Sequence, residues 1–176
     1  MENTALVVID SQAGVFGEGD QAAWRAKETL ENIRLLLDKA REVKMPVVYI
    51  QHDDEELIHG SDDWQICGEI APLAGEPVVE KRTRDSFYQT KLDAVLLSLG
   101  AKTLIFCGAQ TDYCVDTTCR RAYTMGYASF LASDGHTTFG NGVLTGEQIV
   151  AHHNLILKSK YLNVKTTREL LELMDK

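Results

Sequence analysis

The sequence predicts a three-layer α/β/α fold built on a six-stranded, mostly parallel, Rossmann-like sheet. Three observations support this prediction. Short apolar runs alternate with longer segments of helical periodicity along the 176 residues. Residues 5–9, Ala-Leu-Val-Val-Ile, form an unbroken apolar run, which is typical of a parallel strand covered on both faces. No internal repeat or Pro/Gly/Ser-rich linker divides the chain, so we expect one domain spanning residues 1–176.

The first strand should be followed by an amphipathic helix. Apolar side chains recur at spacings of three and four from Ala26 to Ala40, and Asp20 is a candidate N-cap. Pro46 marks the stop before a second strand at residues 47–50, Val-Val-Tyr-Ile. We therefore expect a crossover helix between two parallel strands.

The next elements are less regular. Residues 53–75 are polar and lack periodicity, which favours a long functional loop, and a third strand is expected at 77–79. The second half repeats the strand–helix alternation, and Thr145 with Gln148 has the form of a capping box. Its expected strands are residues 103–107, 128–131 and 163–166, and its expected helices are residues 90–99, about 114–125, one beginning at Thr145 and one at the C-terminus.

Charge and cysteine content exclude several classes of function. The chain has 26 acidic and 18 basic residues and a formal charge of −8, which argues against nucleic acid as the main partner. No apolar run is long enough to span a bilayer, and the acidic start Met1-Glu2 does not resemble a signal peptide. The four cysteines are unevenly spaced and form no CxxC pair, so we expect a reduced, cytoplasmic protein.

Ligands of open α/β sheets bind at the carboxyl ends of the strands. This rule selects five places in the chain: Asp10, His52, Lys81, residues 108–114 and Asp134. Asp10, Lys81 and Cys114 form a chemically coherent set, because a carboxylate and an ammonium in one cleft can activate a thiol. Taken singly, Asp10 is better explained as a loop cap, and Lys81 as part of a solvated basic turn with Arg82 and Arg84; the three together are stronger because each lies at a strand end on the same edge.

The cysteines differ in their expected environments. Cys114 stands where a loop turns into a helix, and a helix N-terminus with a nearby lysine lowers the pKa of a thiol. A hydrolytic Cys114 should then alkylate quickly near neutral pH. The alternative is a small buried core residue. Cys107, in an apolar strand, and Cys119, inside the helix, are expected in the core, whereas Cys67 carries no distinguishing signal.

Several segments occur in the order found in one known superfamily. They are residues 6–12 (Leu-Val-Val-Ile-Asp-Ser-Gln), Glu80-Lys81 followed by Ser86-Phe87 and Thr90, residues 108–115 (Gly-Ala-Gln-Thr-Asp-Tyr-Cys-Val), Gly126-Tyr127 and residues 133–135. With these segments the chain resembles the isochorismatase-like cysteine hydrolases, which include nicotinamidases and other small-amide hydrolases. The resemblance covers nearly the whole chain, and Gly-x-x-Thr-x-x-Cys-Val is its most specific part.

The resemblance implies a catalytic set of Asp10, Lys81 and Cys114. It also implies a cis peptide bond between Ala109 and Gln110, and an oxyanion hole formed by the N–H groups of Gln110 and Cys114. Isochorismatase itself has a different residue at the cysteine position, so Cys114 places this chain with the amide hydrolases. The implied reaction is cleavage of a C–N bond of a small molecule through a thioester, without a cofactor.

The resemblance leaves the binding residues less defined. Nicotinamidases hold a metal with an Asp/His cluster after the second strand, whereas this chain reads Gln51-His52-Asp53-Asp54, with His59 beyond, and does not reproduce the Asp-x-His order. A solvated loop is favoured there, and no metal is expected. Expected pocket walls are Phe16, Trp64 and Tyr113, with His52 as a polar contact, although such aromatics are as often ordinary core. His136 and the His152-His153 pair are expected to be structural or exposed.

Two other functional classes compete with a hydrolase. One is a non-catalytic binding or scaffold protein of the same fold, against which the retention of all three proposed catalytic residues counts. The other is a nucleotide binder, which is disfavoured because Asp10-Ser11-Gln12 follows the first strand in place of Gly-x-Gly-x-x-Gly. The expected partners are a small-molecule substrate and, from the resemblance, other copies of the chain in a homo-oligomer.

Overall fold

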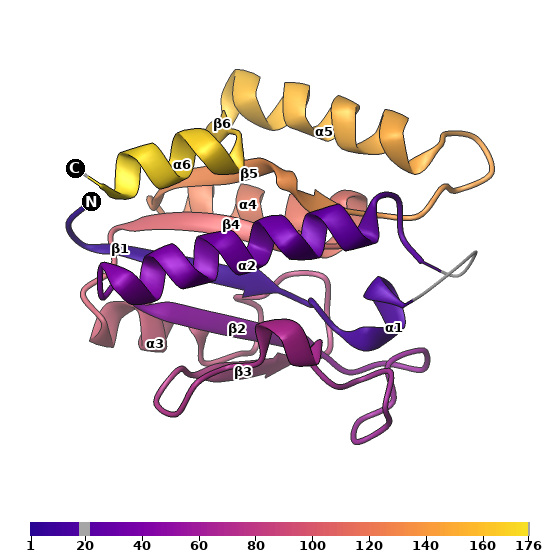
Figure 1. Ribbon diagram of the computed structural model, residues 1–176, viewed down its shortest axis with the longest axis horizontal. Helices are drawn as coiled ribbons and strands as arrows, with labels where there is room; N and C mark the ends of the chain where they lie inside the picture. Colours follow the sequence, from indigo (N-terminus) through magenta and orange to yellow (C-terminus); the bar gives the residue numbers. More distant parts are fainter. Residues whose placement is uncertain (18–21, 176) are drawn as a thin grey trace.

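The computed structural model describes residues 1–17 and 22–175 (Figure 1). Its sheet has six strands, all parallel, in the order β3-β2-β1-β4-β5-β6, which confirms the predicted α/β class and strand count. The strands are β1 (Thr4–Ile9), β2 (Val47–His52), β3 (Val78–Lys81), β4 (Thr103–Ala109), β5 (Ala128–Thr137) and β6 (Asn163–Lys165). The sheet is therefore fully parallel rather than mostly parallel.

Helices cover both faces of this sheet. The α-helices are α1 (Ala13–Phe16), α2 (Ala26–Glu42), α3 (Leu92–Ser98), α4 (Asp116–Thr124), α5 (Gly146–Lys160) and α6 (Thr167–Met174). Two shorter elements are the 3₁₀ turn η2 (Gly68–Ile70) and the π-helical segment η3 (Thr111–Val115). In Figure 1, α2 and α6 lie in front of the sheet, and α3 and α4 lie behind it.

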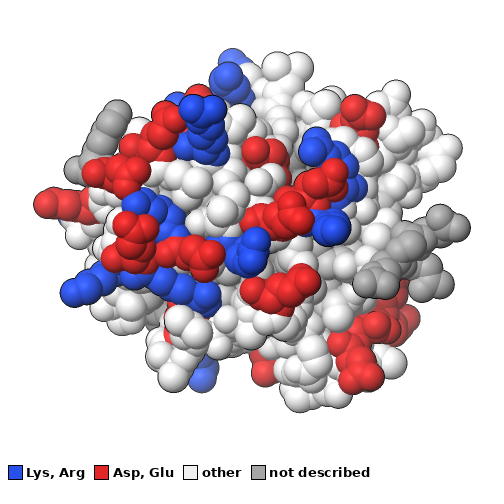
Figure 2. Space-filling view, in the orientation of Figure 1, with Lys and Arg blue, Asp and Glu red and all other residues white. Residues whose placement is uncertain are grey.

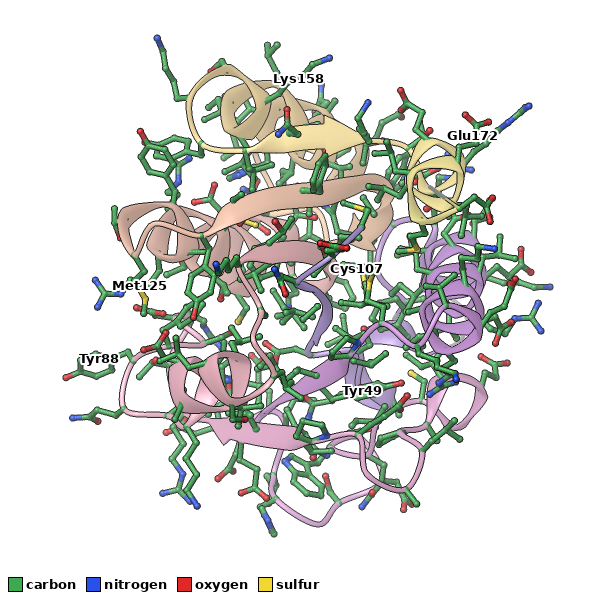
Figure 3. The ribbon with its side chains drawn as sticks, turned by 90° about the vertical axis from the view of Figure 1, so that its left-hand side faces the viewer. Tyr49, Tyr88, Cys107, Met125, Lys158 and Glu172 are labelled. Atoms are coloured by element: carbon green, nitrogen blue, oxygen red, sulfur yellow. The ribbon has the colours of Figure 1, made fainter. Side chains whose placement is uncertain are left out.

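The apolar strands explain the layered architecture. Every residue of β1 and β2 is buried, because alternate side chains enter the two cores on opposite faces of the sheet. Leu6 and Val8 pack with α2 and α6, whereas Val7 and Ile9 pack with α3 and α4. Figure 3 shows Cys107 of β4 in the middle of the molecule, where the sequence places it in the core.

The long helices begin and end according to local chemistry. Thr145 and Thr166 each form a complete capping box at the start of α5 and α6, and the box at Thr145 confirms the prediction from sequence. Gly100, with φ of +68°, follows α3 and allows the left-handed turn that a side chain would disfavour. The proposed cap Asp20 lies outside the described residues; α2 begins at Ala26, after Arg25 in the left-handed conformation.

The chain runs outward from the centre of the sheet in both directions. β1 lies between β2 and β4, so the strand order reverses there. This reversal places a ligand-binding crevice at the carboxyl ends of β1 and β4.

The face seen in Figure 2 carries interspersed acidic and basic side chains over α2 and its surroundings. No helix among residues 1–17 and 22–175 is both long and apolar enough to span a bilayer.

Two predicted elements depart most from their predicted bounds. β5 continues to Thr137, six residues past its predicted end, so Asp134 lies inside the strand rather than after it. The helix expected to start near Cys114 starts with η3 at Thr111, and Cys114 lies within that first turn. The loop at residues 53–75 is irregular, as expected, apart from η2 and a single bridge between Gln12 and Ile66.

Candidate active site

Asp10 is held directly after the central strand. Its N–H donates to the Ile50 carbonyl at 3.0 Å, which extends the β1–β2 ladder by one residue. Its side chain is buried, and apart from the Lys81 ammonium, which lies 2.7 Å from Oδ2, neither carboxylate oxygen has a hydrogen-bond partner among the described residues. A buried carboxylate with free lone pairs is rare in folded proteins, so this position is suited to accepting a proton.

Lys81 ends β3, and its side chain reaches the centre of the crevice with no exposed surface. Nζ contacts four groups, namely Asp10 Oδ2 at 2.7 Å, His52 Nδ1 at 3.0 Å, the Thr83 carbonyl oxygen at 3.1 Å and Cys114 Sγ at 3.1 Å. An ammonium has three hydrogens, so these contacts share them. The Asp10 carboxylate and the Cys114 thiol thus both contact the same cation, the Lys81 ammonium.

The segment after β4 places Cys114 beside the Lys81 ammonium. Gly108 has φ of +122°, and a Cβ there would collide with the backbone carbonyl of Ile9. The absence of a side chain lets the end of β4 pass closely beside the end of β1. η3 follows, and Cys114 within it is 4% exposed. The bond between Ala109 and Gln110 is cis, as the resemblance implies.

The pKa of Cys114 is raised to about 12, mainly by burial; the negative charge of Asp10 also raises it, whereas Lys81 lowers it. The expectation of a thiol pKa lowered by the helix N-terminus and Lys81 is therefore wrong for the protein without substrate, because desolvation outweighs both. The resting site holds a thiol beside a carboxylate–ammonium pair. Fast alkylation near neutral pH is no longer expected.

A cavity of about 410 Å³ opens onto these groups. Its volume suits a small molecule. The residues that line it are Asp10, Gly14, Val15, His52, Asp54, Glu56, Leu57, Asp63, Arg84, Gln110, Tyr113, Cys114 and Phe139.

His52 contacts Lys81 and also lines the cavity. Burial and the charge of Lys81 lower its pKa, so the ring is neutral. Nδ1 faces the Lys81 ammonium and must accept, so Nε2 carries the proton and donates to Asp54 Oδ2 at 2.9 Å. Arg84 Nη1 lies 2.6 Å from Nε2 and 3.1 Å from Asp54 Oδ2, and its hydrogen bond goes to the carboxylate because Nε2 has no free lone pair.

Three donors of this site have the mutual spacing of metal ligands. Atoms of Asp10, His52 and Cys114 lie within 4.8 Å of one another, a spacing that ligands to one ion could have. Lys81 Nζ already lies within 3.1 Å of all three side chains, so an ammonium occupies the place of a cation. The guanidinium of Arg84 adds a second positive charge beside His52. These residues do not fit a metal ion.

Other residues predicted for the site are distributed differently. Tyr113 lines the cavity and is 48% exposed, and His52 lines it as well. Phe16 and Trp64 are not among the lining residues: both pack in the core cluster beside α2, and Trp64 lies against the His59 ring at 4.3 Å. His59 is exposed and 3.8 Å from Glu80. Cys107 and Cys119 are fully buried, as predicted.

Sequence reasoning missed two parts of this site. Arg84 belongs to a basic turn, but its guanidinium faces the cavity and stacks over Tyr113 at 5.8 Å. Gln12 is fully buried, and its amide donates to the His52 carbonyl at 2.9 Å and accepts from the His52 N–H at 2.7 Å. A glutamine three residues after the end of a buried strand is the signal that could have identified this clamp.

Comparison with known proteins agrees with this geometry. A family model described as Isochorismatase domain matches residues 4–143. The isochorismatase family protein YddQ of Bacillus subtilis is 30% identical over 178 residues, which cover 96% of this chain and 99% of YddQ. A crystal structure of an isochorismatase family protein matches with a TM-score of 0.89 at 32% identity, covering 94% of this chain and 99% of that one.

Two further relatives are named as amidases. Nicotinamidase 3 of Arabidopsis thaliana is 29% identical over 152 residues, covering 77% of this chain and 73% of its own length. The structure of N-carbamoylsarcosine amidase from Thermoplasma acidophilum has a TM-score of 0.81 at 27% identity, covering 94% of this chain and 96% of that one. With the family model matching most of its length, the chain belongs to the isochorismatase family of hydrolases.

Proposed function

We propose that this protein is a cysteine hydrolase that cleaves an amide-type C–N bond of a small molecule through a thioester. One observation carries the proposal: the buried Lys81 ammonium lies 2.7 Å from Asp10 Oδ2 and 3.1 Å from Cys114 Sγ. A nucleophile, a base and a charge stabiliser thus meet at a small-molecule cavity. The relatives named as amidases support the choice of a C–N bond.

The first half of the reaction acylates the sulfur. Asp10 takes the thiol proton as Cys114 Sγ attacks the acyl carbon, and Lys81 stabilises the negative charge on sulfur. When the tetrahedral intermediate collapses, the C–N bond breaks and Asp10 gives its proton to the departing nitrogen. The products are a Cys114 thioester and ammonia or an amine.

The second half releases the acyl group. A water molecule transfers a proton to Asp10 and adds to the thioester carbon, after which the C–S bond breaks. The proton on Asp10 returns to sulfur, and the product leaves as a carboxylic acid. No electrons are exchanged, so the cycle needs neither a redox cofactor nor a nucleotide.

We assign the oxyanion hole to the backbone N–H groups of Gln110 and Cys114. Gln110 lines the cavity together with Cys114, which supports this assignment. Loss of one such donor typically reduces the rate on the order of 10²–10³-fold. For substrate contacts we retain Tyr113 and His52 and add Arg84, because all three line the cavity. Phe16 and Trp64 do not line the cavity and are not proposed as substrate contacts.

Turnover of a panel of primary amides, ureido acids and cyclic amides tests this function. Cys114→Ala should reduce kcat at least about 10³-fold, because the nucleophile is lost. The matched control is Cys119→Ala, which removes another buried sulfur five residues along the chain without touching the cavity. It should keep kcat within a few-fold of the wild type.

Comparable activity in Cys114→Ala and wild type would overturn the assignment. Absence of turnover by the folded wild type on every compound class would favour the non-catalytic binding alternative.

The proposed cytoplasmic location is supported by four free cysteines. The homo-oligomer implied by the resemblance remains a proposal that sedimentation would test.

A further inference from the structure

A chain of hydrogen bonds outside the cavity ends on the turn that carries Cys114. Thr111 Oγ1 lies 2.8 Å from His136 Nδ1, and His136 Nε2 lies 3.0 Å from Asn154 Oδ1. Asn154 Nδ2 donates to the Ser133 carbonyl at 2.9 Å. The chain connects η3 to β5 and α5. None of the steps proposed for hydrolysis uses these side chains.

The Ser133 carbonyl, at the far end of this series of hydrogen bonds, fixes which atom donates in each of them. The Ser133 carbonyl can only accept, so the nitrogen of the Asn154 amide faces it and the amide oxygen faces His136. His136 Nε2 must therefore carry the proton. The ring is neutral because burial lowers its pKa to about 4. Nδ1 is then an acceptor, and the Thr111 hydroxyl donates to it.

This bond falls at a sensitive place. Thr111 is fully buried, directly follows Gln110 and is three residues before Cys114. His136 pairs with Gly108 in the sheet, where the register of β4 and β5 shifts. The segment between Gly108 and Thr111 is thus fixed at both ends by His136. The His136 backbone pairs with Gly108 in the sheet, and the His136 ring accepts the hydrogen bond of the Thr111 hydroxyl.

Resting on the function proposed above, we propose that His136 and Asn154 are positioning residues for the nucleophile. By fixing Thr111, they keep Cys114 Sγ beside Lys81 and the Gln110 N–H directed into the cavity. A buried imidazole needs a hydrogen-bond donor for Nδ1, but that donor need not come from the turn that carries Cys114, as the Thr111 hydroxyl does. Asn154 exerts its effect through two intervening side chains, and it does not line the catalytic cavity.

Two variants test the chain from its two ends. Thr111→Val keeps the shape of the side chain and removes the donor, whereas Asn154→Leu removes the partner of His136 Nε2. We expect each to lower kcat at least about tenfold with KM within about twofold of the wild type. Thr111→Ser, which keeps the hydroxyl, should restore most of kcat. A purely structural role predicts a lower Tm with kcat unchanged well below Tm.

Alkylation of Cys114 by iodoacetamide at pH 9, located by peptide mass spectrometry, gives a second readout that needs no substrate. Displacement from Lys81 raises the thiol pKa, so both variants should react several-fold more slowly than the wild type. Wild-type kcat and alkylation rate in both folded variants would overturn the positioning role. If the wild type itself turns over nothing, the alkylation rates alone decide this proposal, and the failure belongs to the proposed function.

Discussion

Asp10, Lys81 and Cys114 carry no net charge together when sulfur holds its proton and the other two are ionised. Moving that proton from Sγ to Asp10 leaves the total unchanged, because the thiolate replaces the carboxylate as the partner of Lys81. A buried site tolerates such an exchange far better than the creation of a new charge. A thiol with a raised pKa can therefore serve as a nucleophile here, because its deprotonation creates no net charge in the site.

The same argument predicts opposite effects for the two neighbours of the thiol. Asp10→Asn removes a charge that raises the Cys114 pKa, whereas replacement of Lys81 by methionine removes one that lowers it. At pH 8 the first variant should alkylate several-fold faster than wild type and the second several-fold slower. Both should lose turnover. Slower alkylation in Asp10→Asn would contradict the charge assignment.

At this scale the sequence predicts the catalytic set but not its protonation. Asp10 and Lys81 could be placed at strand ends because apolar runs precede them. The Cys114 pKa depends on how deeply the fold buries sulfur, which no local pattern contains. Arg84 could not be assigned for a similar reason, since its partner Asp54 lies 30 residues away in the loop.

At the scale of elements, the site depends on how closely β4 approaches β1. Gly108→Ala places a Cβ against the Ile9 carbonyl in a conformation with positive φ. Gly126→Ala is the matched control, because φ there is +90° and no heavy atom lies within 4 Å of the added Cβ. The control should cost about 1 kcal/mol of unfolding free energy.

Gly108→Ala should cost about 3 kcal/mol more than that control, because backbone atoms rather than a flexible side chain must move. Denaturant unfolding of the two variants beside the wild type measures the difference. Equal costs at the two positions would mean that the two strand ends separate easily, and the close approach would then not constrain the site.

The sequence predicts which segments are strands and which are helices, but it does not always predict where they end. The apolar runs at 5–9 and 103–107 identify β1 and β4 well. β5 runs on through Ser133, Asp134 and Gly135, which have low strand propensity, because pairing with β4 resumes at Gly108 and His136. The tertiary pairing thus overrides local preference, and it places His136 beside the turn that carries Cys114.

At the scale of the whole molecule, buried histidine links stability to pH. The His136 pKa falls from an ordinary 6.5 to about 4 on folding, mainly because of burial, with His153 lowering it further and the Asn154 hydrogen bond and Asp134 opposing. Above pH 6.5 both states are neutral and the group has no effect. Below it the unfolded chain binds the proton first, so stability is lost as the pH falls towards 4.

The loss from His136 should be on the order of 3 kcal/mol between pH 7 and pH 4. His52, whose pKa is also lowered, adds to it. His136→Gln removes one of the two buried-histidine titrations, so its unfolding free energy should vary less over this interval than that of the wild type, whatever its stability at pH 7. Unfolding of both proteins at each pH provides the comparison, and parallel curves would contradict a neutral, buried His136.

Covalent catalysis by Cys114 is tested most directly by acid-quenched mass spectrometry of the protein during turnover of a substrate found in the amide panel. We expect a mass gain equal to the acyl half of that substrate on the peptide containing Cys114, with the amine already released. Cys114→Ala should show neither the adduct nor turnover. Sustained hydrolysis by Cys114→Ala, with no adduct on the wild type, would rule out a Cys114 thioester.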